Sequence, residues 1–268
     1  MDITKLQKSK RSRLEHVDTY KVACDNPKKY IRALKSLKSG NENGSGINEF
    51  VGKLKSMNKT CVIKVHFTNS KFTERELQIM NLLRDCPYVV KHICTYSCFD
   101  DKTRWMEALS KPQTTCHELT FIVMDYIENG DLIEFLKNAT TLQIKALCIQ
   151  CALAIIDMSQ KYNVSQGDFN SGNVLIKLDK PSKKSVRIGK HSFTFDTHGV
   201  QPLFIDFGRG YICKTSTRYI IEDITTLFAI IANYIPDIAF KEYLNNVVLN
   251  ISRKHKPHFS HVFDPILT

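Results

Sequence analysis

The most informative segment of this chain runs from Gln166 to Ile176 and reads QGDFNSGNVLI. Asp168 and Asn173 lie five residues apart in it, on a predicted loop that leads into a short apolar strand. A carboxylate and an amide at this spacing can address a substrate hydroxyl and a divalent cation together. We therefore consider Asp168 a candidate catalytic residue and Asn173 a candidate metal ligand.

A second segment with related chemistry follows at residues 202–208, which read PLFIDFG. Asp206 lies at the end of a predicted apolar strand, and Gly208 permits a sharp turn directly after it. This position suits a carboxylate that holds Mg²⁺ against phosphate groups. The stretch between the two segments contains a further predicted strand, HSFTFD at residues 191–196.

Upstream, Lys64 stands in the otherwise apolar strand CVIKV at residues 61–65. Its ammonium must reach the strand edge or meet an anion, because an unpaired buried charge is costly. Residues 73–85, TERELQIMNLLRD, have helical spacing, and Thr73 and Glu76 match a capping box. Glu76 lies on the inward side of this helix, so an ion pair with Lys64 would fix the ammonium beside a phosphate. A surface Lys–Glu pair is the alternative.

Two glycines precede the strand that carries Lys64. Gly44 and Gly46 stand ahead of Val51 in NENGSGINEFVGKL, and their backbone N–H groups could approach phosphate oxygens closely. An ordinary hairpin is the alternative. A dinucleotide-binding turn is excluded, because such a turn leads into a helix whereas residues 50–54 predict a strand.

The rest of the chain predicts a strand-rich first part and a helix-rich second part. A continuous apolar strand is expected at residues 119–126, a short helix at 132–137 and a long helix at 142–162, and the chain from residue 218 onward is mostly helical. Cys148 and Cys151 lie on one face of the long helix, where buried small apolar side chains are expected rather than zinc ligands.

Composition narrows the class of protein. The chain has 268 residues, 43% of them hydrophobic and 24% charged, which suits one large domain or two unequal lobes that share a cleft. No apolar signal segment opens it, and Glu222 and Asp223 interrupt its densest apolar stretch, so we expect neither secretion nor a membrane span. Nine cysteines without a regular framework predict reduced thiols and an intracellular protein, in the cytoplasm or the nucleus.

The formal net charge of +11 is concentrated in two runs. Residues 1–40 hold 11 Lys and Arg against 4 acidic residues, and residues 177–190 hold six basic residues and one acidic. Pro181 and Ser182 predict a surface loop in the second run. Either run could be a solvated face or a surface for an acidic protein substrate. Basic runs could also attract nucleic acid. However, no helix-turn-helix, zinc or aromatic RNA-binding signature accompanies them, so no motif supports a nucleic-acid partner.

From Asn41 to Asp223, this chain resembles the protein kinase superfamily. The resemblance rests on four features in the same order along the chain: the glycine-rich turn, the strand lysine, the loop of Asp168 and the D-F-G of Asp206. The resemblance implies an α+β bilobal fold, with ATP and Mg²⁺ as cofactors. It implies an antiparallel-sheet N-lobe at residues 41–126 and a mostly helical, reduced C-lobe at 127–268, after a basic N-terminal extension at 1–40.

The resemblance also implies residue roles. Asp168 would be the catalytic aspartate, supported by Lys64 and Glu76, and Asn173 and Asp206 would hold the metal. Asp223 resembles the buried helix aspartate that anchors the catalytic loop. The residues implied to contact the nucleotide are Gly44, Gly46, Val51, Lys64, Met124, Asp125, Ile127, Asp131 and Leu175.

Several departures from the kinase pattern bear on regulation and substrate. Gln166 and Gly167 replace the usual His-Arg, so no arginine follows there to receive an activation-loop phosphate. Only 14 residues separate Gly208 from Asp223, without an A-P-E sequence. We therefore expect an enzyme that is not switched by phosphorylation of Thr215, Ser216 or Thr217. Asn170 replaces the lysine that many serine/threonine kinases carry two places after the catalytic aspartate.

The function that this resemblance implies is an ATP-dependent phosphotransferase, first of all a serine/threonine protein kinase. The stretch between Asn173 and Asp206 resembles haspin-type kinases and divergent kinases of large DNA viruses. The string G-D-F-x-x-G-N is also similar to aminoglycoside and choline phosphotransferases, so a small-molecule kinase is one alternative. A pseudokinase scaffold is another.

Overall fold

The computed structural model describes residues 49–56, 59–66, 71–99, 118–128, 130–188, 191–212 and 217–253. Several sequence predictions lie outside the described residues: the extension 1–40, Gly44, Gly46, Thr215 and Ser216. The chain divides into two compact units. The first contains the residues up to Glu74 and Lys91–Tyr126, and the second contains Arg75–Val90 and the residues from Ile127 onward.

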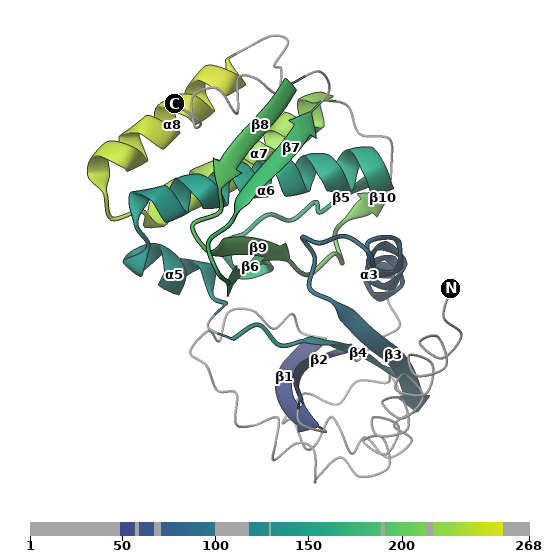
Figure 1. Ribbon diagram of the computed structural model, residues 1–268. Coiled ribbons are helices and arrows are strands. Elements are labelled where there is room, and N and C mark those ends of the chain that lie inside the picture. The colour runs from purple at the N-terminus through teal and green to yellow at the C-terminus, as the bar shows by residue number, and fades with distance from the viewer. Residues whose placement is uncertain are drawn as a thin grey trace, which may run out of the picture. The chain divides into compact units, whose positions relative to one another are not determined.

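The first unit contains a four-stranded antiparallel sheet in the order β1-β2-β4-β3 (Figure 1). The strands are β1 (Glu49–Ser56), β2 (Lys59–His66), β3 (His92–Phe99) and β4 (Glu118–Asp125). The apolar runs predicted at residues 50–54, 61–65 and 119–126 are therefore strands, as expected. Lys64 lies on the central strand β2, with Val51 and Ile122 as its cross-strand partners.

Helix α3 (Lys71–Leu82) contributes to both units, because the division falls between Glu74 and Arg75. The predicted helix is confirmed, but the predicted capping box is wrong. The helix begins two residues before Thr73, so Thr73 lies inside it and is buried rather than at its N-terminal cap. Thr73 is only 1% exposed, so its side chain is packed inside the structure and does not cap the helix.

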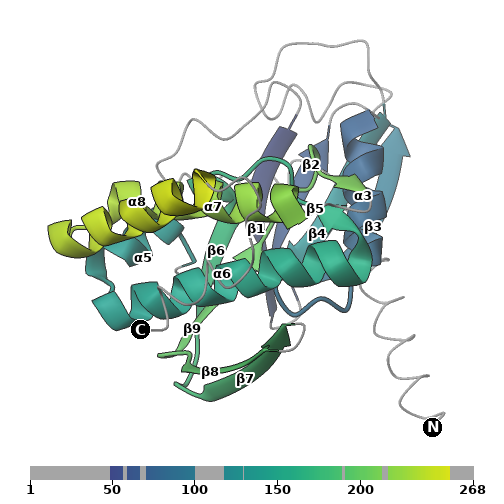
Figure 2. The same cartoon turned by 90° about the horizontal axis from the view of Figure 1, so that it is seen from above.

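The second unit is mostly helical, with α5 (Leu132–Asn138), α6 (Thr141–Tyr162), α7 (Thr217–Tyr234) and α8 (Ile238–Ser252). A capping box of Thr140 and Gln143 starts α6, and Asn163 ends it with a left-handed φ of 55°. Helix α7 packs against both α6 and α8 (Figures 1 and 2). These elements confirm the helices predicted at residues 132–137 and 142–162 and from residue 218 onward.

Helix α6 is the core of this unit. Most of its side chains are buried, including both Cys148 and Cys151, which confirms that these thiols are packed as small apolar groups. Burial raises the pKa of Cys148 to about 12. Among the described helices, α6 alone is long and apolar enough to cross a membrane, by length and composition, and 72% of its most apolar stretch is buried inside the structure.

Three short antiparallel pairs complete the second unit: β5 (Val164–Ser165) with β10 (Tyr211–Ile212), β6 (Val174–Leu178) with β9 (Val200–Phe204), and β7 (Lys183–Ile188) with β8 (His191–Asp196). The surface loop predicted at Pro181 and Ser182 is confirmed, because both residues are exposed and lie between strands β6 and β7. The rest of the basic run is largely in strands, since β7 pairs with β8 along its whole length. Lys184 of β7 turns toward α6, where its ammonium donates to the side-chain oxygen of Gln150 at 3.3 Å.

Candidate functional site

The loop between β5 and β6 brings the first two candidate residues together. The side-chain amide of Asn173 donates to the backbone carbonyl of Asp168 at 2.8 Å. Asn170 caps the short helix η2 (Ser171–Asn173) by accepting from the Gly172 N–H at 2.9 Å, and its own amide donates to the same Asp168 carbonyl at 3.2 Å. The loop is thus closed around the backbone of Asp168, whose carboxylate remains 36% exposed.

Asp206 joins this loop through the β6–β9 pair. The Ile205 N–H donates to the backbone carbonyl of Asn173 at 3.1 Å, so the residue before Asp206 is bonded directly to the candidate metal ligand. Asp206 itself has a φ of 60°, in the left-handed region. A non-glycine residue in this conformation is uncommon, and such residues concentrate at functional sites.

A buried glutamine connects the two segments. Gln166 is fully buried; its side-chain oxygen accepts from the Asp168 N–H at 2.8 Å, and its side-chain nitrogen donates to the carbonyl of Asp206 at 3.0 Å. One side chain therefore sets the backbone positions of both carboxylates. The sequence alone identifies Gln166 only as a departure from the kinase pattern, because nothing local indicates which distant carbonyl a glutamine side chain will meet.

Two glycines hold the segment after Asp206 against the same loop. Gly167 has a φ of 72°, and a Cβ on it would lie 2.5 Å from the backbone oxygen of Arg209. A Cβ on Gly210 would lie 3.0 Å from the backbone oxygen of Ser165. The β5–β10 pair continues this contact. The resulting backbone position places Arg209 Nη1 at 3.7 Å from Asp168 Oδ1, a contact that the sequence reading missed.

Asp223 of α7 supports the start of the loop that carries Asp168. The Ser165 hydroxyl donates to Asp223 Oδ2 at 2.8 Å, in agreement with the anchoring role that the kinase resemblance implied. Burial raises the pKa of Asp223 to about 6, and the hydrogen bond from Ser165 opposes this rise. The pKa of Asp223 in the folded protein therefore lies well above the range of an ordinary aspartate.

This titration predicts a pH-dependent stability. The folded-state pKa of Asp223 lies above its ordinary value of 3.8, so the folded protein binds this proton more tightly than the unfolded chain does. Its contribution to the free energy of unfolding is full below pH 3.8 and is lost as the pH rises through about 6. Asp223→Asn removes the titration, so between pH 4 and 7.5 the variant should gain about 3 kcal/mol relative to the wild type.

Urea unfolding of both proteins across this pH range measures the difference. Ser165→Ala is the matched control: it removes the hydrogen bond that lowers the pKa of Asp223, so the wild-type pH dependence should extend to higher pH. Parallel stability profiles for the wild type and Asp223→Asn would contradict the assignment.

The donor set around Asn173 and Asp206 fits a magnesium ion that also binds phosphate. Asn173 uses its amide nitrogen in the bond to Asp168, which leaves its amide oxygen as the end that a cation would take. Mg²⁺ is typically held by one or two protein oxygen ligands together with substrate phosphates and water. The described residues contain no group of three or more His, Cys, Asp or Glu side chains that could hold a metal ion.

The predicted nucleotide-binding residues are distributed over both units. Lys64 is only 4% exposed, Met124 and Asp125 end strand β4, and the side chain of Val51 is not described. Glu76 is buried in the part of α3 that belongs to the second unit, so its pairing with Lys64 stays a prediction. The helix-rich unit also contains Ile127, which is half-buried.

Asp131 and Leu175 do come together, since their backbones form an isolated antiparallel bridge. The carboxylate of Asp131 accepts from the Glu134 N–H at 2.9 Å and thereby caps α5. Asp131 therefore has a structural role, and the ribose contact implied by the resemblance stays a prediction.

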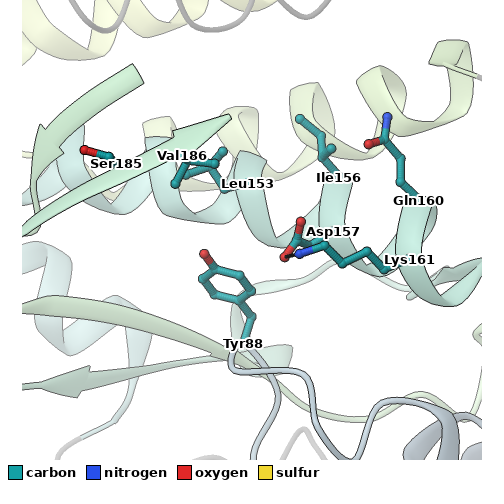
Figure 3. Close-up of a pocket in the computed structure, with 8 residues that line it drawn as sticks. All are labelled: Tyr88, Leu153, Ile156, Asp157, Gln160, Lys161, Ser185 and Val186. Carbon is teal, nitrogen blue, oxygen red and sulfur yellow. Dashed lines mark hydrogen bonds and ion pairs between the residues drawn. The ribbon is translucent and has the colours of Figure 1, made fainter. Parts of the chain in front are cut away.

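A separate pocket of about 350 Å³ lies in the second unit between α6, β7 and the segment after α3 (Figure 3). Tyr88, Asp157, Lys161 and Val186 are among its lining residues, and the Asp157–Lys161 ion pair of 2.8 Å lies at its edge. None of the predicted catalytic or metal-binding residues lines this pocket. The candidate site is therefore defined by the hydrogen-bonded loop and not by this cavity.

Comparison with known proteins agrees with the fold. No protein-family model and no curated protein sequence matches this chain. Among solved structures, the chain is similar to WaaP in its complex with acyl carrier protein, with a TM-score of 0.50 and 16% sequence identity over 83% of this chain and 81% of WaaP. WaaP has a kinase-like fold, and the predicted α+β, kinase-like fold of this chain is thereby confirmed.

Proposed function

We propose that this protein is an ATP-dependent phosphotransferase that acts on a hydroxyl group. The observation that carries the proposal is the hydrogen-bonded cluster in which Gln166 and Asn173 hold the backbones of Asp168 and Asp206. These residues lie on two chain segments that one hydrogen-bonded network holds together, and they supply what phosphoryl transfer requires, which is positioning and control of charge. The kinase-like fold supports the same conclusion.

The roles of the residues follow from their chemistry. The half-exposed carboxylate of Asp168 would orient the acceptor hydroxyl and take its proton. Asn173 and Asp206 would hold Mg²⁺, which when bound neutralises charge on the nucleotide phosphates. Gln166 would keep the two carboxylate-bearing segments in register. Lys64 and Glu76 would provide the phosphate-binding ammonium and its partner, as the resemblance implies.

We further propose a serine/threonine protein kinase that does not depend on phosphorylation of its activation segment. Gly167 supports this, because its left-handed backbone and its contact with Arg209 exclude the arginine that would receive a regulatory phosphate. The resemblance to haspin-type and large-virus kinases stays a prediction based on residues 173–206. A small-molecule kinase is the second candidate, because Asn170 caps η2 where many protein kinases carry a substrate-facing lysine.

One experiment separates these functions. The purified full chain is incubated with labelled ATP and Mg²⁺, in one arm with a mixture of acidic and basic proteins and in the other with aminoglycosides, choline and simple sugars. We expect transfer to a protein hydroxyl that is absent from Asp168→Ala. Transfer only to a small alcohol would establish the second candidate. Nucleotide binding without transfer in any arm would indicate a pseudokinase and overturn the proposed function.

A further inference from the structure

We propose that Arg209 is a further catalytic residue, whose guanidinium leaves Asp168 when the substrates bind and stabilises the negative charge on the phosphoryl group during transfer. This inference rests on the proposed function and adds a residue to its site. Arg209 follows directly after Gly208, and its Nη1 lies 3.7 Å from Asp168 Oδ1.

The contact with Asp168 has little structural value of its own. The side chain of Arg209 is 70% exposed, and its distance of 3.7 Å to the carboxylate exceeds that of a good hydrogen bond. Exposed ion pairs of this kind contribute little to stability. The guanidinium is therefore free to exchange one anionic partner for another at small cost, which is what a residue that acts on a transient charge requires.

The backbone of Arg209, in contrast, is held firmly. Its carbonyl faces Gly167 so closely that any side chain at position 167 would collide with it at 2.5 Å. On its other side, the Gly210 N–H donates to the Phe207 carbonyl at 2.9 Å, and strand β10 begins at Tyr211. An exposed cation on a fixed backbone beside the carboxylate of Asp168 is the arrangement that supports a catalytic role.

The catalytic loop also lacks a cation of its own. Residues 168–173 read DFNSGN, without a lysine, arginine or histidine. In phosphoryl transfer, negative charge on the equatorial oxygens of the transferred group must be met by positive charge from metal ions and side chains. Among the ion pairs identified in the described residues, that of Arg209 is the one that brings a cation to Asp168.

The proposed step is balanced in atoms and charge. The acceptor oxygen attacks the γ-phosphorus of ATP, a new O–P bond forms, and the bond to the β-phosphate oxygen breaks with ADP as the leaving group. Asp168 takes the proton of the acceptor hydroxyl. Arg209 stays protonated throughout and moves from the carboxylate to the oxygens of the transferred group, which leaves the Asp168 carboxylate able to accept the proton.

The test compares Arg209→Ala and Arg209→Lys with the wild type in single-turnover phosphoryl transfer, with ATP affinity measured separately by titration of a fluorescent nucleotide. We expect Arg209→Ala to lower the transfer rate about 10²–10³-fold, with nucleotide affinity changed less than about threefold. Arg209→Lys should restore part of the rate, and guanidinium ion at millimolar concentration should partly rescue the alanine variant. Arg218→Ala is the matched control, because Arg218 is an equally exposed arginine paired with Glu222 on α7.

The outcomes distinguish this inference from the proposed function. An active wild type with an equally active Arg209→Ala variant would overturn the role of Arg209 and leave the phosphotransferase intact. A variant that loses only ATP affinity would make Arg209 a binding residue and would overturn the role as well. A wild type that neither binds ATP nor transfers phosphate would overturn the proposed function itself. Thermal melting of each variant confirms that the exposed substitution leaves the fold unchanged.

Discussion

Replacing Asp168 with alanine is expected to lower the rate of phosphoryl transfer about 10²–10⁴-fold while the fold is retained. The loop that carries Asp168 is held by its backbone, since Gln166 binds its N–H and Asn173 binds its carbonyl. The side chain of Asp168 takes part in neither bond, so its removal leaves the loop in place and eliminates only the carboxylate that is proposed to receive the proton.

Single-turnover transfer from labelled ATP measures this effect, and nucleotide affinity is determined in parallel. Asp168→Asn should be nearly as slow as the alanine variant, because an amide keeps the shape of the side chain but cannot accept a proton as a base. Asp85→Asn is the matched control, since Asp85 is a highly exposed carboxylate paired with Arg84 in the same unit. Full activity in Asp168→Ala would contradict the assignment of this residue.

Much of the fold follows from local sequence pattern. Helix α6 has continuous apolar periodicity and strands β2 and β4 are compact apolar runs, so each was predicted close to its observed bounds. The chain after residue 217 was predicted to be mostly helical, without separate bounds for α7 and α8. Strand β3 was missed because HICTYSCF mixes polar and apolar residues without clear alternation, and its pairing with β4 decides its conformation. Strand β7 was missed for the same reason, since β8 provides its partner.

In the candidate site too, the residues related by local spacing were predicted, and those that act through distant contacts were not. Asp168 and Asn173 were found because they share one short loop, and their relation depends on local spacing. Gln166 and Arg209 were not assigned these roles because each acts through a contact with a segment about 40 residues away, and a sequence without aligned relatives does not report such contacts. The one sequence signal of these contacts is the glycine beside each residue. Gly167 follows Gln166 and Gly210 follows Arg209, and both glycines stand where the backbone packs too closely to leave space for a side chain.

Asp206 offers a test in which activity and stability should separate. Its φ of 60° is strained for most residues but is tolerated by asparagine, aspartate and glycine. We therefore compare Asp206→Asn, Asp206→Gly and Asp206→Ala. All three remove the negative charge that is proposed to bind the metal, and they should lower the transfer rate by about 10² or more.

Stability should follow a different order, because it depends on the backbone at this position. Asp206→Asn and Asp206→Gly should unfold near the wild-type temperature, because asparagine keeps a local hydrogen-bond acceptor and glycine has no Cβ to clash. Asp206→Ala should lose about 1–2 kcal/mol, because alanine has a Cβ but no polar side chain to accept a local hydrogen bond, as Asp206 Oδ1 does from the Gly208 N–H at 3.4 Å. Thermal unfolding measures this, and titration with Mg²⁺ in the presence of ATP should show a weakened metal dependence in all three variants. An alanine variant as stable as the asparagine variant would contradict the strained backbone. An asparagine variant with wild-type activity and metal dependence would remove Asp206 from the metal site, since the charge of its carboxylate is then not required.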